Sequence, residues 1–152
     1  MPVLESHVFD IARVIQLAVA PVFLLTAIGT IINALVTRLG RAVDRRRTVE
    51  DQLDASEGEA REDMLAELRI LARRILLALW SIGLAVLSAL FVCLLIGTAF
   101  LGAFISLDLS RPVALLFVAA VAALTVCLLL FMREVLLAAL HIHHGVKVRP
   151  GA

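Results

Sequence analysis

Polar side chains recur along one side of a segment that is otherwise apolar. They stand three or four positions apart, the spacing that brings side chains to one face of an α-helix, and they are Thr26, Thr30, Asn33 and Thr37. A polar stripe on a helix in lipid faces either another helix or water. Its hydroxyl and amide groups can bond across a helix–helix interface, where Gly29 would permit close approach. They can equally line the wall of a pore, and the sequence leaves both interpretations open.

Charged residues follow this stripe at its C-terminal end. Arg41 and Asp44 continue the same spacing, and Arg38 comes directly after Thr37. If several copies bring this helix to a common axis, Arg38 and Arg41 form positive rings at the mouth of a pore, and Asp44 offsets part of that charge. The sign of the favoured ion stays open. The pore interpretation requires a homo-oligomer, because one copy has too few helices to enclose a channel.

Three further polar residues lie near the ends of apolar segments. Gln16 is expected to form a hydrogen bond with a neighbouring helix. Arg133 and Glu134 are adjacent, so on a helix their side chains point about 100° apart and do not pair with each other. Arg133 is expected to reach lipid phosphate or to pair with an acid such as Asp44. For Glu134, a buried ion pair with an arginine is favoured over a role in proton relay.

The sequence lacks the residue sets that catalysis or a resident metal would need. It has no glycine-rich phosphate loop, no HExxH and no GxSxG. His141, His143 and His144 cluster near the C-terminus, but no acid beside them could orient them as metal ligands. Cys93 and Cys127 lie in apolar segments and are expected to behave as small hydrophobic residues. We therefore expect neither an enzyme nor a bound cofactor or metal.

Three charge-free segments decide the fold class. Hydrophobic residues make up 62% of the chain, charged residues only 18%, and the mean hydropathy is +1.03; a soluble domain carries about a quarter charged residues. The segments without Asp, Glu, Lys or Arg are 14–37, 75–107 and 112–132. About 20 helical residues cross a hydrocarbon core of about 30 Å. The sequence therefore predicts an all-α membrane protein with three transmembrane helices.

The charged residues gather between the first two predicted spans, in a segment that holds nine arginines and nine acidic residues. We predict that it forms a helical hairpin extending both spans beyond the membrane. Ser56 and Glu59 have the spacing of a capping box, which marks the start of the second hairpin helix. The apolar sides expected to face each other are Met64, Leu68, Leu71 and Ile75 on one helix and Leu39, Val43 and Leu53 on the other.

The whole chain is expected to form a single membrane domain, 1–152. Its expected parts are an interfacial helix over 1–13, a first span over 14–37, the hairpin over 38–74, a second span over 75–105, a third span over 112–134 and a tail over 135–152. Small residues at helical spacing in the second span, Ser81, Ala85 and Ser88, predict a seam for close helix packing.

The distribution of Lys and Arg predicts the orientation in the membrane. Nine lie in 38–74 and three in the C-terminal part, but only one in the 106–112 link and one before the first span. Positive charge stays on the cytoplasmic side, so the hairpin and the C-terminus are expected there, with the N-terminus outside. The net charge of +1 shows no basic excess, which argues against a nucleic-acid partner. The expected partners are the lipid bilayer, further copies of the chain, and ions.

Two segments resemble a known family. The segment Ile15–Arg45 resembles a family of bacterial membrane proteins known as domain of unknown function 2721, and Leu130–Ala138 is similar to the end of that family's third helix. The residues that carry the resemblance are Gln16, Pro21, Asn33, Arg38, Arg41, Asp44, Arg45, Arg133 and Glu134. The resemblance implies a bacterial inner-membrane location and three helices around a charged hairpin, and it implies no activity.

The leading functional hypothesis is a homo-oligomeric channel or pore-like protein whose first span lines the path. The alternative is a non-catalytic accessory or scaffold subunit that docks onto a larger membrane complex through the hairpin. The two hypotheses differ in the expected assembly: a symmetric oligomer of this chain alone, or a complex with unrelated subunits.

Overall fold

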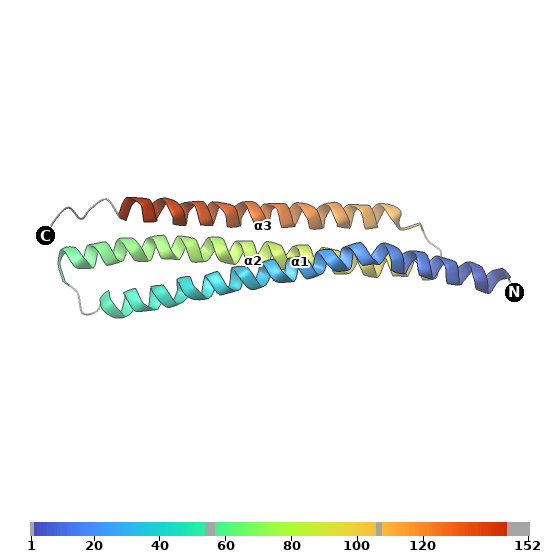
Figure 1. The fold of residues 1–152 in the computed structure, drawn as a ribbon, viewed down its shortest axis with the longest axis horizontal. Helices are drawn as coiled ribbons and strands as arrows, with labels where there is room; N and C mark the ends of the chain where they lie inside the picture. Colours follow the sequence, from blue (N-terminus) through green and yellow to red (C-terminus); the bar gives the residue numbers. More distant parts are fainter. Residues whose placement is uncertain (1, 54–56, 106–107, 146–152) are drawn as a thin grey trace. The chain divides into compact units, whose positions relative to one another are not determined.

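Three helices account for the described part of the chain: α1 (Pro2–Leu53), α2 (Glu59–Ile105) and α3 (Ser110–Gly145) (Figure 1). The structure is a computed structural model that describes residues 2–53, 57–105 and 108–145, with side chains described between residues 16 and 136 of these ranges, except at 17 and 103. These ranges contain no strand. Each helix is long and apolar enough to cross a membrane, which confirms the predicted all-α class with three candidate spans.

The helix α1 is continuous from Pro2 to Leu53, whereas the sequence suggested a separate interfacial helix over 1–13. Neither glycine nor proline lies at the expected junction near residue 13, so no local signal ends the helix there. Pro21 lies inside α1 and does not end it either. Whether residues 1–13 lie along the membrane surface stays a prediction.

The start of α2 lies later than the sequence predicted. Glu59 is its first residue rather than the third residue of a capping box, because Gly58 has a φ of 65°, outside the helical region. Glycine adopts this conformation without a steric penalty. The backbone N–H of Arg61 donates to the Gly58 carbonyl over 3.1 Å and closes the first turn. Glu59 and Glu62 in that turn favour the positive end of the helix dipole. Ser56 lies outside the described residues.

The chain divides into two compact units, and each takes a part of all three helices. The first unit comprises Met1–Ile32 with Leu84–Thr125, and the second comprises Asn33–Gly83 with Val126–Ala152.

In the first unit, α2 packs closely against α3 through small side chains. Ser88 and Ala85 of α2 and Ala120 of α3 are fully buried. The Ser88 hydroxyl donates a hydrogen bond of 2.7 Å to the Ala120 carbonyl. That carbonyl accepts this bond from a neighbouring helix, an arrangement that requires the two backbones to lie close together. Ile28 of α1 and Val92 of α2 are also fully buried and complete the centre of this unit.

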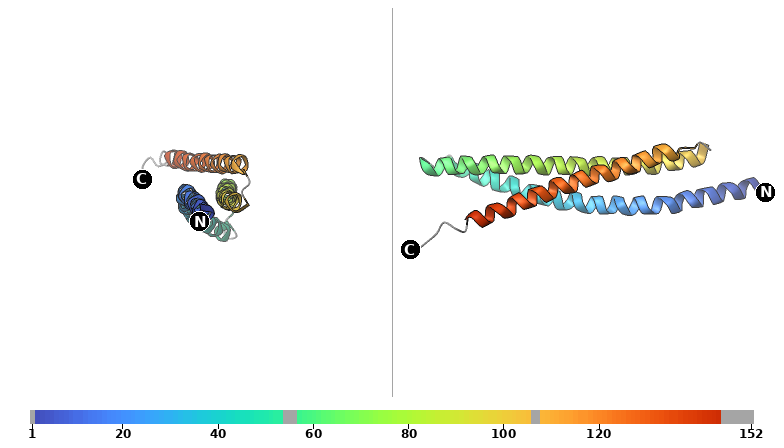
Figure 2. Two further views of the ribbon diagram at one scale, coloured as in Figure 1. Left: turned by 90° about the vertical axis from the view of Figure 1, so that its right-hand side faces the viewer. Right: turned by 90° about the horizontal axis from the view of Figure 1, so that it is seen from above.

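In the second unit, the end of α1 and the start of α2 lie side by side as a hairpin (Figure 1). Figure 2 shows the red C-terminal part of α3 inclined to the green part of α2. The buried residues of this unit are Leu35 and Val49 of α1, Leu71, Ala78 and Ser81 of α2, and Cys127 and Glu134 of α3. The predicted small-residue seam is confirmed, since Ser81, Ala85 and Ser88 are each at most 1% exposed. Val49 was not among the predicted hairpin positions, although it is buried more completely than those around it.

A short link precedes α3 and sets its first turn. The Ser110 backbone N–H donates to the Asp108 carboxylate over 3.1 Å, and the Val113 N–H donates to the Leu109 carbonyl over 3.1 Å. The hydrogen bonds from the Ser110 hydroxyl and from its backbone N–H lower the pKa of Asp108. An anion at a helix N-terminus also interacts favourably with the helix dipole. Asp108 in its ionised form therefore holds the start of α3.

We expect S88L to destabilise the first unit, because a larger side chain cannot enter the contact between α2 and α3 without separating the helices. Overpacking of this kind costs about 1–3 kcal/mol. The measurement is the unfolding free energy of the purified protein in mixed micelles. C93L is the matched control, since Cys93 is exposed on the same helix; equal stability of the two variants would contradict the packing described here.

The Asp108 contact makes the start of α3 sensitive to acid. Because its pKa is lowered in the folded protein, the contact contributes fully above the ordinary aspartate pKa of about 3.9 and is lost as the pH falls through the lowered value. We expect amide hydrogen exchange in residues 110–113, corrected for the intrinsic pH dependence, to speed up only below that range. In D108A the exchange should be fast at every pH. If the exchange rate still changed with pH in D108A, the acid sensitivity would belong to another group, and the role given to Asp108 would be wrong.

Candidate functional site

The polar stripe of α1 is exposed in both units. In the first unit, the hydroxyls of Thr26 and Thr30 donate to carbonyls one turn earlier in α1, over 3.2 and 3.1 Å. In the second unit, the Thr37 hydroxyl donates to the Asn33 carbonyl over 2.8 Å. All four side chains are exposed. In each unit, therefore, neither α2 nor α3 covers the part of the stripe that belongs to that unit.

Asn33 differs from the three threonines in its hydrogen bonding. A threonine hydroxyl in a helix satisfies its donor on the preceding turn, as these three do. The side-chain amide of Asn33 carries two donors and an acceptor, and within the described ranges it makes no hydrogen bond, although the backbone carbonyl of Asn33 accepts one from Thr37. Of the predicted stripe, Asn33 is therefore the residue whose side chain has no hydrogen-bond partner among the described residues.

The second unit contains a pocket of about 230 Å³, which we call the arginine pocket. Side chains from all three helices line it: Arg38, Arg41, Ala42, Arg45, Leu71, Arg74 and Glu134. The predicted residues Arg38, Arg41 and Glu134 thus meet in one place, although the sequence assigned them to different features. Arg38 and Arg41 stand three positions apart on α1, which places both on the side of the helix that faces this pocket.

Among the described residues of the second unit, Glu134 is the buried charged residue. Glu134 is 5% exposed, and its Oε1 lies 3.8 Å from an Nη atom of Arg74. This distance allows an ion pair but is too long for a hydrogen bond. Glu134 Oε2 and Arg74 Nε are buried and have no hydrogen-bond partner among the described residues. The structure thus pairs Glu134 with an arginine, as the sequence favoured, and leaves one polar atom of each residue unsatisfied.

Arg45 is held by the other helix of the hairpin. Its Nε and an Nη atom donate to the two carboxylate oxygens of Glu67 over 2.8 and 3.1 Å. The hydrogen bonds to Glu67 and the charge of that carboxylate raise the pKa of Arg45. Both side chains are about half exposed, so solvent screens the attraction and the pair adds little to stability. The register of α1 against α2 places Glu67 beside Arg45, and the ion pair leaves Arg45 without a free charge.

Arg38 does not continue the polar stripe. Its guanidinium lies over the ring of Phe131 in α3, 5.1 Å from the ring centre. Arginine stacks favourably on aromatic faces, and one residue of separation along a helix turns Arg38 about 100° away from Thr37. The predicted pairing of Arg38 and Arg41 as rings around a pore therefore conflicts with the position of Arg38, which faces its own protomer.

The remaining predicted polar residues make no ion pair within the described ranges. Arg133 and Asp44 are both exposed and form no ion pair with each other. The other expectation for Arg133, a contact with lipid phosphate, stays a prediction. Asp44 contributes its carbonyl, which accepts a hydrogen bond of 3.1 Å from Thr48. Gln16 is exposed, and no bond to a neighbouring helix is formed within the described part of the chain. The side chains of the three clustered histidines lie outside the described residues.

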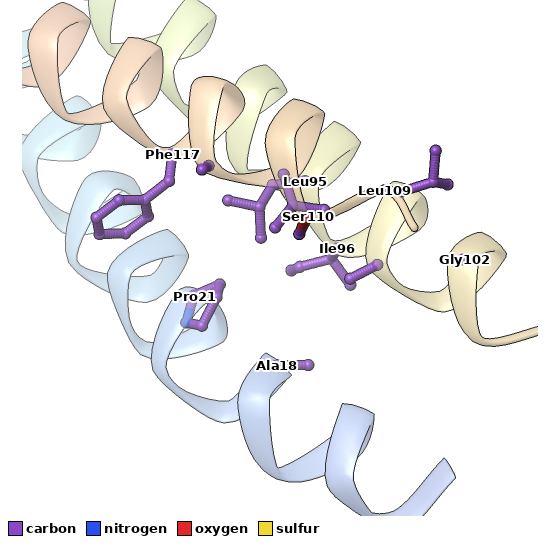
Figure 3. Close-up of a pocket in the computed structure, with 11 residues that line it drawn as sticks. Ala18, Pro21, Leu95, Ile96, Gly102, Leu109, Ser110 and Phe117 are labelled. Carbon is purple, nitrogen blue, oxygen red and sulfur yellow. The ribbon is translucent and has the colours of Figure 1, made fainter. Parts of the chain in front are cut away.

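An apolar groove of about 570 Å³ occupies the first unit (Figure 3). Figure 3 shows Pro21 of α1, Ile96 of α2 and Phe117 of α3 converging on it. The only side-chain hydroxyl in its lining is that of Ser110. The groove therefore offers packing surface rather than a site for chemistry.

Sequence analysis missed Arg74, Glu67 and Arg45 as partners. One signal could have identified Arg74: it is the last charged residue before the predicted second span, and Glu134 is the last residue of the predicted third span. Antiparallel neighbouring spans bring these two ends to the same side of the membrane. The Arg45–Glu67 pair had no comparable signal, because several arginines and acids of the hairpin have equivalent spacing.

The comparisons with known proteins agree with the resemblance noted in the sequence. No curated protein and no solved structure matches the chain. The family model described as "Protein of unknown function (DUF2721)" matches residues 18–144. This match covers parts of all three helices and most of the chain, and the chain therefore belongs to the domain of unknown function 2721 family.

Proposed function

We propose that the protein is a homo-oligomeric channel or pore-like protein, with α1 lining the path. The observation that carries the proposal is Asn33, an exposed amide inside a candidate membrane span with no hydrogen-bond partner among the described residues. An unsatisfied amide in hydrocarbon costs several kcal/mol. Either a second copy of the chain or water supplies the missing partner, and a pore lined by α1 supplies both.

The neighbours of Asn33 on α1 support a polar path. Thr26, Thr30 and Thr37 have satisfied their donors on the helix itself, and each oxygen retains a lone pair for water or a passing solute. Arg41 and Asp44 are exposed beyond Thr37 and provide charges of both signs at that end. Arg38 is left out of the proposed path because it lies over Phe131. With both signs present, the proposal names no particular ion.

The proposed location is a bacterial inner membrane, with the N-terminus outside. The arginine-rich hairpin and the C-terminus lie in the cytoplasm, according to the distribution of positive charge. In this orientation, Arg41 and Asp44 stand at the cytoplasmic mouth of the path.

A second candidate is a non-catalytic accessory or scaffold subunit of a larger membrane complex. The hairpin favours it, because its tip exposes charged residues that make no described ion pair, among them Asp51, Arg61 and Asp63. Such a surface can dock onto a partner of complementary charge. This candidate assigns the missing partner of Asn33 to an unrelated helix instead of a second copy.

We expect N33L to reduce flux of potassium or chloride into liposomes by about tenfold or more, the factor that about 1.4 kcal/mol of added barrier produces. Leucine removes the polar group and narrows the proposed path. A34L is the matched control, since Ala34 is exposed on α1 about 100° away from Asn33. Flux through A34L should equal that of the unchanged protein.

The assembly state separates the two candidates. Native mass spectrometry of the purified protein should show one symmetric oligomer if the pore proposal holds. A monomer without flux, or a stable complex with unrelated subunits, would contradict it and favour the accessory role.

A further inference from the structure

We propose that the arginine pocket binds a phosphate group that carries or adjoins a hydroxyl donor. Two sources share this chemistry: a soluble phosphate, and the headgroup of an anionic lipid such as phosphatidylglycerol. The proposal concerns a pocket inside one protomer and does not depend on conduction along α1.

The charge of the pocket selects an anion. Four arginines line it against one carboxylate, that of Glu134. Glu67 neutralises Arg45, but among the described residues Arg38 and Arg41 have no ion pair, and Arg74 has only its contact of 3.8 Å. Positive charges confined around about 230 Å³ repel one another. A bound anion removes that repulsion.

The unsatisfied atoms of the pocket residues describe the ligand more closely. Arg74 Nε is a buried donor without an acceptor, and Glu134 Oε2 is a buried acceptor without a donor, within the described part of the chain. Buried polar groups are nearly always hydrogen-bonded in folded proteins. Both residues line the pocket, so a ligand that offers a charged oxygen and an O–H group complements the guanidinium of Arg74 and the carboxylate of Glu134 together. An anion without a hydroxyl would leave Glu134 unsatisfied and repelled.

Phosphate chemistry meets both requirements. The planar guanidinium matches the oxygens of phosphate and can bind two of them at once. Monohydrogen phosphate retains a proton at neutral pH, which sulfate does not. The phosphodiester of phosphatidylglycerol lacks that proton, but the glycerol of its headgroup supplies hydroxyls. A water molecule occupies about 30 Å³, so the pocket has room for a phosphate group with several neighbouring groups of that size.

The place of the pocket along the sequence is compatible with the lipid source. Arg38 directly follows the predicted first span, and Arg74 directly precedes the predicted second span. These positions are expected at the membrane surface, where lipid phosphates lie and where arginine attracts anionic headgroups.

The first experiment measures which probes bind the purified full-length protein. Calorimetry in detergent compares inorganic phosphate with sulfate, and native mass spectrometry compares retained phosphatidylglycerol with phosphatidylethanol, an anionic lipid without headgroup hydroxyls. Phosphate bound at least about tenfold more tightly than sulfate assigns a soluble phosphate. Preference for phosphatidylglycerol alone assigns a lipid headgroup. Absence of saturable binding by every probe overturns the proposal.

Two variants test the residues. Arg41 is exposed, so R41Q should keep the fold and weaken binding of the preferred probe by about tenfold, through loss of one charge-assisted hydrogen bond. R47Q is the matched control, because Arg47 is exposed on the same helix and does not line the pocket. An equal loss in both variants would show a general charge effect and would overturn the proposal.

E134Q tests the hydroxyl requirement. Its amide can donate as well as accept, so the preference for phosphate over sulfate, or for phosphatidylglycerol over phosphatidylethanol, should fall by about tenfold. A merely structural Glu134 would change the affinity for both members of a pair equally, and that result would overturn the assigned role.

Discussion

A polar group that enters hydrocarbon has to be satisfied by the protein itself, because water is absent there. The helices satisfy nearly all of their backbone groups internally, and most polar side chains follow the same rule. Thr30 and Thr37 bond to their own helix, and Ser88 bonds to the carbonyl of Ala120. Within the candidate span of α1, Asn33 is the exposed amide without a hydrogen-bond partner among the described residues. The proposed oligomer would supply the partner that Asn33 lacks, either from a second copy of the chain or from water in the path.

In the second unit, the two sides of α1 serve different purposes. Asn33 and Thr37 are exposed, whereas Arg38 lies over Phe131 and lines the arginine pocket with residues of α2 and α3. Buried ion pairs such as Arg74–Glu134 are weak evidence of stability, since desolvation offsets most of their attraction. Their unsatisfied atoms are more informative, because they describe what a ligand would have to provide. One helix therefore combines an outward polar surface with an inward cationic one.

Much of the fold and part of the site could be predicted from the sequence. Charge-free segments identify the candidate spans, since only a self-satisfied helix suits lipid. The seam at Ser81, Ala85 and Ser88 was predictable because small residues at helical spacing let backbones approach. The start of α2 was predicted too early, because the capping-box spacing takes no account of Gly58, whose positive φ lies outside the helical region. The predicted ion pair between Arg133 and Asp44 is not formed among the described residues. Complementary charge alone does not say which side of one helix faces a neighbouring helix.

By itself, the sequence determined the helical class, the three apolar segments, the charged hairpin and the family, because each of these depends on composition and local periodicity. Only the tertiary structure decided which charges meet. The register of α1 against α2 selects Glu67 for Arg45, and the rotation of α3 brings Glu134 to Arg74. Many hairpin arginines and acids have equivalent spacing along the chain, so local sequence cannot distinguish among their pairings. The packing of the helices decides among them. For Glu134 the reason is burial, because a buried carboxylate is tolerated only where a cation from another helix lies within reach.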